Sequence, residues 1–316
     1  MRFLPEAECY RRIDPCLGYL RELPDVPAGG PPLPVHFFWR GRFGAKQSLG
    51  LKSFLATQDL AATPAVLWLD DPAEFDRAPD NPHLAPWLPH LSLRLFTLAE
   101  AVRDTPFAGA AWLREAAGSV AIADIARLAI LHRHGGIYSD LDAIFLRPLA
   151  ALHRLTGAAE FVFQWSALPR GTHAFCRFDA HSPAITTLIE RANAARSAHC
   201  AAVLDFAAPI PELLVLPAPF FSPLWLQVDR HDATAAAPFR RFADFFRGFG
   251  WWFHRDSRIA GPANLFPGAF TYHWHGLWRA REHRDSYAGL LDAAFNTALR
   301  EKYPAIGPLP AFGSSA

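Results

Sequence analysis

Two aspartates one residue apart, Asp140 and Asp142, have the residue type and the spacing that suit a hard metal ion. On an extended strand, residues i and i+2 point to the same face, so both carboxylates can bind one cation, or one of them can bind substrate hydroxyl groups. Mg²⁺ and Mn²⁺ prefer oxygen ligands, and Mg²⁺ sites combine one or two carboxylates with phosphate oxygens. Taken alone, such a pair is more often part of a turn or a helix cap.

An acid and an arginine, Asp124 and Arg127, precede this pair at helical spacing. With the acid pair behind them, they form a set that can hold a divalent cation and the diphosphate that it neutralises. The alternative interpretation of Asp124 and Arg127 is an ion pair on the protein surface, which stabilises a helix by about 0.3 kcal/mol. Gly135-Gly136 is interpreted as the end of the helix in a left-handed conformation, which lets a strand start close by. His132 and His134 lie on different faces of that helix and are expected to be structural.

The order of the predicted elements indicates an α/β fold with a mainly parallel sheet and crossover helices. In such sheets ligands bind at the carboxyl ends of the strands, and Trp39, Asp70 and Asp140 fall at such ends. The sequence predicts strands at 35–39, 65–69, 92–96, 144–146, 161–165 and 174–178, and helices at 48–58, 119–134, from Pro183 onward after the N-cap Ser182, and at 286–300. Residues 1–33 are expected to form a helical lead-in and a linker, and 205–223 to be irregular.

The composition excludes several classes of protein. With 31 basic and 30 acidic residues and a net charge of +1, the chain lacks the electrostatic footprint of a nucleic-acid binder. Its start lacks the apolar region of a secretory signal, and no apolar run is long enough for a spanning helix. Four scattered cysteines indicate reduced thiols and a cytoplasmic protein. The basic residues Arg279, Arg281, His283 and Arg284 are interpreted as a solvated helix face, with a peripheral membrane contact as the alternative.

The pattern Asp124-x-x-Arg127-x6-His134-Gly-Gly-Ile-Tyr138-x-Asp140-x-Asp142 resembles the DXD-containing glycosyltransferases with a GT-A fold. That family includes capsule and lipopolysaccharide glycosyltransferases, the α-1,4-galactosyltransferase type and, more remotely, glucosylating toxins. The match is dense over 122–148, thinner over Val35 to Gly41, and partial near the end of the chain. The resemblance implies a GT-A-like, Rossmann-type sheet flanked by helices, with additional helical and irregular C-terminal elements. It also implies one catalytic domain over 34–316, in which 34–150 hold the nucleotide sugar and metal and 151–316 the acceptor.

The resemblance also implies roles for individual residues. Asp142 would bind Mn²⁺ or Mg²⁺ directly, and Asp140 would contact the donor and reach the metal through water. Asp124 and Arg127 would meet donor-sugar hydroxyls, with Arg127 near the diphosphate. Trp39 would lie near the nucleobase, although a plain core tryptophan is an equal alternative.

A second motif lies near the C-terminus, at Tyr272-His273-Trp274-His275-Gly276-Leu277-Trp278. It resembles the family's late His-His-Trp-x-x-Ser-Trp segment, which returns to the nucleotide site. The resemblance implies that His273 is a metal ligand, with His275 behind it, and that Trp278 contacts the substrate. Leu277 stands where the family usually has Ser. A packed aromatic cluster with a hydrogen-bonded histidine is the alternative.

The resemblance implies a metal-dependent, retaining glycosyltransferase in polysaccharide biosynthesis, and this is the leading hypothesis. The donor is expected to be a nucleotide sugar, most simply a UDP-sugar, and the acceptor a glycan, a lipid or a protein. No second acid stands out as the base that an inverting reaction needs, although Asp70, Asp71 and Glu74 remain candidates. Two alternatives stay open, a metal-dependent phosphohydrolase and a catalytically inactive nucleotide-sugar-binding module.

Overall fold

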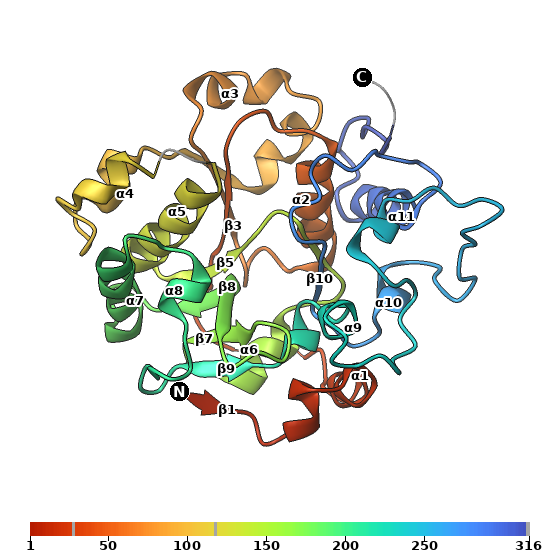
Figure 1. The fold of residues 1–316 in the computed structure, drawn as a ribbon. Coiled ribbons are helices and arrows are strands. Elements are labelled where there is room, and N and C mark those ends of the chain that lie inside the picture. The colour runs from red at the N-terminus through yellow and green to blue at the C-terminus, as the bar shows by residue number, and fades with distance from the viewer. Residues whose placement is uncertain (27–28, 117–118, 314–316) are drawn as a thin grey trace.

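The computed structural model describes residues 1–26, 29–116 and 119–313, and these build a central sheet covered by helices on both faces (Figure 1). Within this part of the chain the sheet has eight strands in the order β1-β9-β7-β8-β5-β2-β3-β4. The strands are β1 Arg2–Phe3, β2 Val35–Trp39, β3 Ala65–Leu69, β4 Ser92–Leu95, β5 Gly136–Ser139, β7 Phe161–Gln164, β8 Gly171–Phe178 and β9 Leu214–Leu216.

Strand direction brings most carboxyl ends to one edge of this sheet. Only β8 runs against its neighbours, β5 and β7, and the other pairs are parallel. The carboxyl ends of β2, β5 and β7 therefore lie at the same edge as the start of β8. This is the edge at which ligands bind in open α/β sheets.

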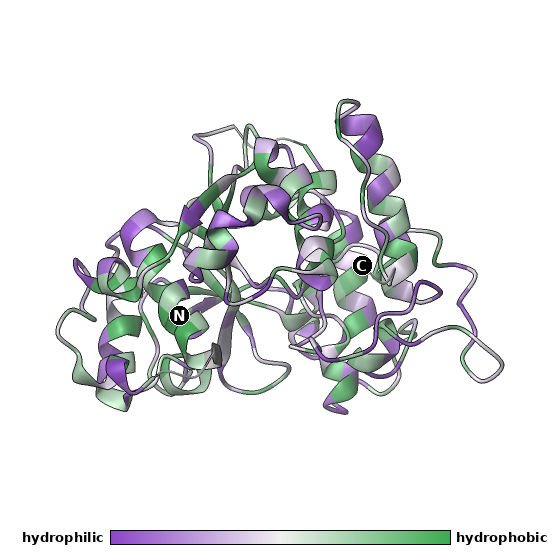
Figure 2. Cartoon of the chain, turned by 90° about the horizontal axis from the view of Figure 1, so that it is seen from above, coloured by the Kyte–Doolittle hydropathy of each residue, from purple (hydrophilic) through white to green (hydrophobic). Residues whose placement is uncertain are grey.

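Helices pack on the two faces of the sheet. They are α1 Ile13–Arg21, α2 Ala45–Thr57, α3 Pro72–Asp76, α4 Leu98–Val102, α5 Ser119–His134, α6 Ala150–Thr156, α7 Pro183–Ala195, α8 Cys200–Val203, α9 Trp225–Val228, α10 Pro262–Leu265 and α11 Tyr287–Lys302. Short 3-10 helices cover Ala7–Tyr10, Ala78–Asp80, Ala85–His90, Ala111–Arg114, Ala218–Phe220 and Phe242–Phe245. Figure 2 shows hydrophilic and hydrophobic residues on the same helices, as expected where one side of a helix packs and the other faces water.

Two hydrophobic clusters form the core, one on each face of the sheet. Alternate residues of β2 divide between them: Phe37 joins the cluster with α2, and Phe38 joins the cluster with α5 and α7. In β3 and β5, Leu67 and Ile137 join the first cluster, while Trp68 and Tyr138 join the second. A strand that is covered on both faces has a continuous run of apolar residues in its sequence. This is why the sequence predicts β2 and β3.

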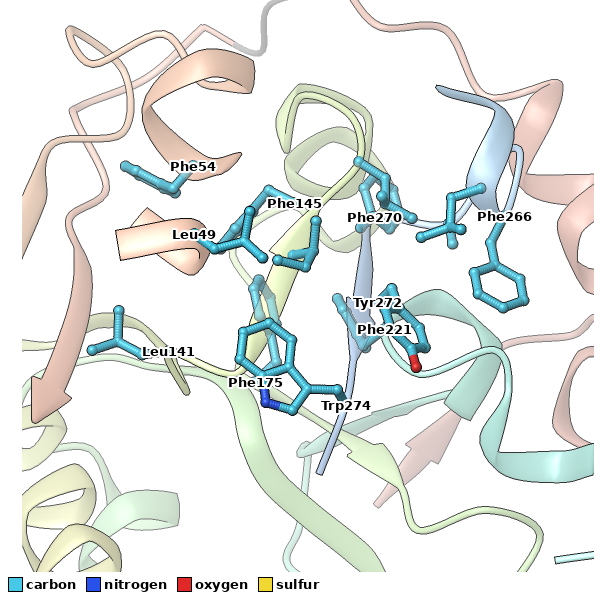
Figure 3. Packing of buried hydrophobic residues seen from close by; sticks show 14 of the residues in the cluster. Leu49, Phe54, Leu141, Phe145, Phe175, Phe221, Phe266, Phe270, Tyr272 and Trp274 are labelled. Atoms are coloured by element: carbon cyan, nitrogen blue, oxygen red, sulfur yellow. The ribbon is translucent and has the colours of Figure 1, made fainter. Parts of the chain in front are cut away.

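A two-stranded antiparallel sheet joins the middle of the chain to its C-terminal part. It pairs β6, Ala143–Phe145, with β10, Thr271–His273, and places His273 opposite Ala143. Figure 3 shows its packing, with Leu49 and Phe54 of α2 near Phe145 and with Phe270, Tyr272 and Trp274 beyond. Phe54 and Phe145 meet edge to face, with ring centroids 5.0 Å apart. This packing fixes the position of Asp142, the residue immediately before β6.

Most predicted elements agree with the structure, and the α/β fold with a mainly parallel sheet is confirmed. The prediction for 205–223 is wrong in part, because β9 lies inside the sheet between β1 and β7. β1 itself, Arg2–Phe3, pairs with β9 at the edge of the sheet. The four cysteines are free thiols, as predicted, and all are buried. No helix in the described ranges has both the length and the apolar character needed to cross a bilayer.

Gly135 and Gly136 have the conformation that the sequence predicts for the end of α5. Their φ angles are +62° and +96°, a region that other L residues rarely adopt. A Cβ on Gly136 would lie 2.6 Å from the Pro34 carbonyl oxygen, so the chain needs glycine there for space as well. The two glycines let α5 end and β5 begin without a loop, which sets Asp124 and Arg127 beside the end of β5.

A second glycine contact yields a test of the packing of α2. A Cβ on Gly50 would lie 2.2 Å from the Leu141 carbonyl oxygen. We expect Gly50→Ala to lower the free energy of unfolding by about 2 kcal/mol or more, because backbone must move to relieve the clash. The effect of the clash on the free energy of unfolding opposes the stabilisation of up to about 1 kcal/mol that alanine, compared with glycine, brings to a helix interior. Urea denaturation measures the difference.

Gly18→Ala in α1 is the matched control, because the nearest atom to its added Cβ is an Arg21 side-chain nitrogen at 3.9 Å. We expect this substitution to stabilise the protein by about 0.5–1 kcal/mol. Equal effects of the two substitutions would contradict the close approach of α2 to Leu141.

Candidate active site

A cavity of about 570 Å³ opens at the edge of the sheet where β2, β5 and β7 end. Its volume falls in the usual range for small-molecule sites, roughly 300–1,000 Å³. Side chains from both halves of the chain line it, including Trp39, Asp124, Arg127, Asp140, Asp142, Trp165, His173, Trp225, His273 and Trp278. The cavity therefore brings together every residue that the sequence predicted for the site.

The C-terminal segment binds the Asp142 carboxylate at both oxygens. The His273 Nε2 donates to Asp142 Oδ1 over 2.9 Å, and the Gly276 backbone N–H donates to Oδ2 over 2.6 Å. Burial alone would raise the pKa of Asp142, but the His273 charge and these hydrogen bonds hold it below its usual value. Burial would likewise lower the pKa of His273, and the Asp142 carboxylate instead raises it. The two side chains form a buried ion pair.

Asp140 completes a three-residue cluster with Asp142 and His273. One ligand atom from each residue lies within 4.8 Å of the others. Burial and the charge of Asp142 raise the pKa of Asp140, although Arg127 opposes the shift. Two carboxylates and one imidazole converge on one point, which fits a divalent cation of the Mn²⁺ or Mg²⁺ kind. A cation held by Asp142 and His273 would replace the hydrogen bond that joins them.

Arg127 links the helix α5 to the acid pair. Its guanidinium donates to Asp124 Oδ1 over 2.9 Å and to Asp140 Oδ1 over 2.5 Å, and it also contacts His173 Nδ1. It lies over the Tyr138 ring, with its Cζ atom 4.6 Å from the ring centroid. Only 5% of the Arg127 side chain is exposed. The pair of Asp124 and Arg127 is thus buried, which rules out the alternative of a surface ion pair. Removing one partner from a buried pair typically costs about 3–5 kcal/mol.

Aromatic pairs flank the acid cluster on two sides. The rings of Trp39 and Trp278 lie 4.6 Å apart beyond the end of β2, and those of Trp165 and Trp225 lie 5.4 Å apart beyond the end of β7. Three strand spacings of about 4.8 Å separate the ends of β2 and β7, so these ends are about 14 Å apart. The end of β5, which leads into Asp140, lies between them.

Sequence reasoning missed Trp165, Trp225 and His173. Trp165 was predicted as the last residue of a strand, and its place at the carboxyl end of that strand was a usable signal. Trp225 and His173 carry no such signal, because their places depend on packing. Of the two histidines considered as a metal ligand, His273 and His275, it is His273 that lies with the acid cluster. His275 stacks on His273, with ring centroids 4.1 Å apart, and its Nε2 lies 2.9 Å from the Ser222 hydroxyl.

The other acids that remained candidates for a catalytic base, Asp70, Asp71 and Glu74, do not line the cavity. Asp70 forms an ion pair with Arg40 over 3.3 Å. Asp71 caps α3 through the Ala73 N–H, and Glu74 accepts from the Phe43 N–H. These three carboxylates thus have structural partners. The carboxylates that do line the cavity are Asp124, Asp140 and Asp142.

Comparison with known proteins gives a match over the same stretch of chain. Residues 82–161 match the family described as the glycosyltransferase sugar-binding region containing a DXD motif. Residues 82–161 are therefore similar to the DXD-containing region of glycosyltransferases. The matched range contains Asp124, Arg127, Asp140 and Asp142 but not His273. No curated protein matched the sequence.

Two solved structures of glycosyltransferases resemble the chain weakly. One, titled PaToxG glycosyltransferase, has 14% identity and a TM-score of 0.42, and the match covers 60% of this chain and 69% of that one. The other, titled WbbM bifunctional glycosyltransferase, has 16% identity and a TM-score of 0.28. That match covers 44% of this chain and 24% of the other, so the likeness extends over about a quarter of the WbbM chain.

Lys46 holds the C-terminal side of the cavity in place. Its ammonium group donates to the backbone carbonyls of Leu277, Trp278 and Ala280, over 2.8, 2.8 and 2.5 Å. The side chain of Leu277, which stands where the family usually has Ser, packs against the hydrophobic core. The position of Trp278 therefore depends on a lysine of α2 that lies far away in the sequence.

We expect Lys46→Met to lower the free energy of unfolding by about 2 kcal/mol, because three carbonyl oxygens lose their charged donor. Hydrogen exchange of the backbone at 276–280 should become faster, while exchange in β2 and β3 stays the same. Urea denaturation and exchange mass spectrometry measure the two effects. Arg279→Met, at an exposed neighbouring residue, is the control and should change stability by less than about 0.5 kcal/mol. Unchanged exchange at 276–280 in Lys46→Met would contradict this role.

Proposed function

We propose that this glycosyltransferase uses a divalent cation and a nucleotide sugar, most simply a UDP-sugar, and retains the configuration of the transferred sugar. The observation that supports this proposal is the cluster of Asp140, Asp142 and His273 inside a cavity, with Arg127 bound to Asp140. A diphosphate leaving group carries negative charge that needs neutralisation, and a cation supplies it without proton transfer.

In this proposal Asp142 and His273 would hold the ion directly, and Asp140 would contact the donor and reach the ion through water. Mn²⁺ suits a set of two carboxylates and one imidazole, and Mg²⁺ suits the carboxylates. The chemistry that the ion supplies when bound is stabilisation of the diphosphate as it leaves. The protein itself positions the two carboxylates: the Gly276 backbone N–H fixes one oxygen of Asp142, and the Arg127 guanidinium fixes one oxygen of Asp140.

Arg127 and Asp124 are assigned to the donor. The Nε atom of Arg127 is buried and has no hydrogen-bond partner among the described residues. A buried donor without a partner is costly, and an anionic or hydroxyl-bearing ligand in the cavity would satisfy it. Asp124 lines the same wall and accepts from Arg127, so its second oxygen can bind a sugar hydroxyl. These contacts support binding of the donor sugar and its diphosphate beside α5.

The two pairs of tryptophans in the cavity are assigned to different parts of the substrates. Trp39 and Trp278 are assigned to the nucleobase, because a flat ring system stacks well against a tryptophan ring. Trp165 and Trp225, beyond the end of β7, are assigned to the acceptor, which can be a glycan, a lipid-linked glycan or a protein. Residues 34–150 would then bind the donor and 151–316 the acceptor, with β10 and Trp278 closing the donor side.

A retaining reaction agrees with the acids that line the cavity. An inverting transferase needs a base to take the acceptor proton. Asp124 and Asp140 are both bound to Arg127, and Asp142 is bound to His273 and Gly276. Each carboxylate that lines the cavity in the described part of the chain is thus already bound to an arginine or a histidine. In the retaining route the phosphate of the leaving group accepts the proton.

Asp142→Asn tests the role of the metal cluster. The substitution removes one negative charge and keeps the shape of the side chain, so the fold should persist. We expect sugar transfer and donor hydrolysis to fall by about a hundredfold or more, because the ion stabilises the leaving group by several kcal/mol. Rates with a UDP-sugar and Mn²⁺ measure the loss. Asp76→Asn, an exposed acid of α3, is the matched control.

Full Mn²⁺-dependent activity of Asp142→Asn would contradict the assignment. The products that the wild-type enzyme releases distinguish a transferase from a phosphohydrolase. A transferase releases nucleoside diphosphate and sugar, whereas a phosphohydrolase releases phosphate or a nucleoside monophosphate from the same nucleotide sugar.

Nucleotide binding can be tested without knowledge of the acceptor. We expect UDP with Mn²⁺ to raise the melting temperature by several degrees, because a ligand at a hundred times its dissociation constant stabilises by about 2.7 kcal/mol. UDP without metal, and GDP or CMP with metal, should have much smaller effects. Differential scanning fluorimetry measures the shifts. Equal stabilisation with and without Mn²⁺ would show that the nucleotide does not bind through the cation.

A further inference from the structure

Two adjacent tryptophans, Trp251 and Trp252, stand out from the surface between α9 and α10. Their exposed fractions are 83% and 87%, whereas the next most exposed large apolar residue in the described ranges, Phe3, reaches 49%. In Figure 1 the chain between α9 and α10 extends to the right edge of the molecule, away from the central sheet. Large apolar side chains gathered on a surface commonly mark a contact with a partner or a membrane.

The chain on either side of the two tryptophans is held firmly. Gly250 and Phe253 form an antiparallel bridge, so Trp251 and Trp252 are the central residues of a tight turn. Phe249 stacks on Phe253, with ring centroids 6.0 Å apart, and meets the buried Tyr287 edge to face at 5.0 Å. The turn thus projects two tryptophans from a base that is anchored on the start of α11.

Positive charge surrounds this turn. Five exposed arginines lie in 240–258, against two acids, Asp244 and Asp256; the arginines are Arg240, Arg241, Arg247, Arg255 and Arg258. Both acids pair with arginines of the same segment. The chain at 279–285 packs beside the turn, since the Phe249 N–H donates to the Asp285 carbonyl over 2.7 Å. It adds three arginines, Arg279, Arg281 and Arg284, against two acids, Glu282 and Asp285. The whole chain has a net charge of only +1, so this surface is a local excess.

We propose that the turn at 250–253 and its arginines form a membrane-contact surface that binds an anionic bilayer. Tryptophan prefers the boundary between headgroups and acyl chains, because its ring is apolar and its N–H is polar. Each arginine near an anionic membrane surface adds attraction that salt weakens. A neutral glycan or an apolar protein face would not use the excess of arginine. The proposal does not depend on the reaction that the cavity performs.

The test is co-sedimentation of the whole purified protein with lipid vesicles. We use phosphatidylcholine alone and phosphatidylcholine with about one third phosphatidylglycerol, an anionic lipid. The wild-type protein should sediment with the anionic vesicles and remain in solution with the neutral ones. Trp251→Ala/Trp252→Ala should lower the partition coefficient for anionic vesicles about tenfold or more. Trp251→Phe/Trp252→Phe should keep most of the binding.

Phe3→Ala, at an exposed aromatic residue on β1, is the control and should bind as the wild type does. The tip of the turn contributes no buried contact, so the double alanine variant should keep the wild-type melting temperature. Three results would overturn the proposal: no binding to anionic vesicles, undiminished binding of the double alanine variant, or a wild-type dimer in light scattering that the same variant abolishes. The last result would assign the turn to a second copy of the chain.

Discussion

The crowding of three carboxylates in one cavity, two of them buried and Asp140 half-buried, is the constraint on which the site depends. Asp124, Asp140 and Asp142 face it together, and Arg127 and His273 supply the opposing charge. With all five ionised the group carries one negative charge in excess, and burial makes such an excess costly. The raised pKa of Asp140 is a sign of this cost. A divalent cation relieves it and then leaves positive charge for a diphosphate, which links the electrostatics of the cavity to the proposed reaction.

Other parts of the fold serve to hold these charges. The glycine pair after α5 sets Arg127 beside the end of β5, and the pairing of β6 with β10 brings His273 to Asp142. Lys46 holds the carbonyls around Trp278 from the far side. Each of these contacts joins residues that are distant in sequence or fixed by backbone geometry. The cavity is therefore a product of the whole domain rather than of the DXD segment alone.

The elements with strong local signals could be predicted from the sequence. β2, β3 and α5 have the predicted bounds, because continuous apolar runs and the glycine pair mark where they begin and end. β1 and β9 were missed, since they have two and three residues and gain their stability from partners elsewhere in the chain. The choice between His273 and His275 could not be made from spacing, because the register of β6 against β10 decides which ring meets Asp142. Trp225 and His173 are cavity residues through packing alone.

Anomalous diffraction at the manganese edge, from crystals grown with Mn²⁺ and UDP, tests the central claim most directly. We expect one strong peak within coordination distance of the Asp142 carboxylate and the His273 imidazole, next to the diphosphate. The Arg127 side chain should keep its contact with Asp140 in the same crystals. A nucleotide bound in the cavity with no metal peak at Asp142, or a peak elsewhere in the molecule, would contradict the account.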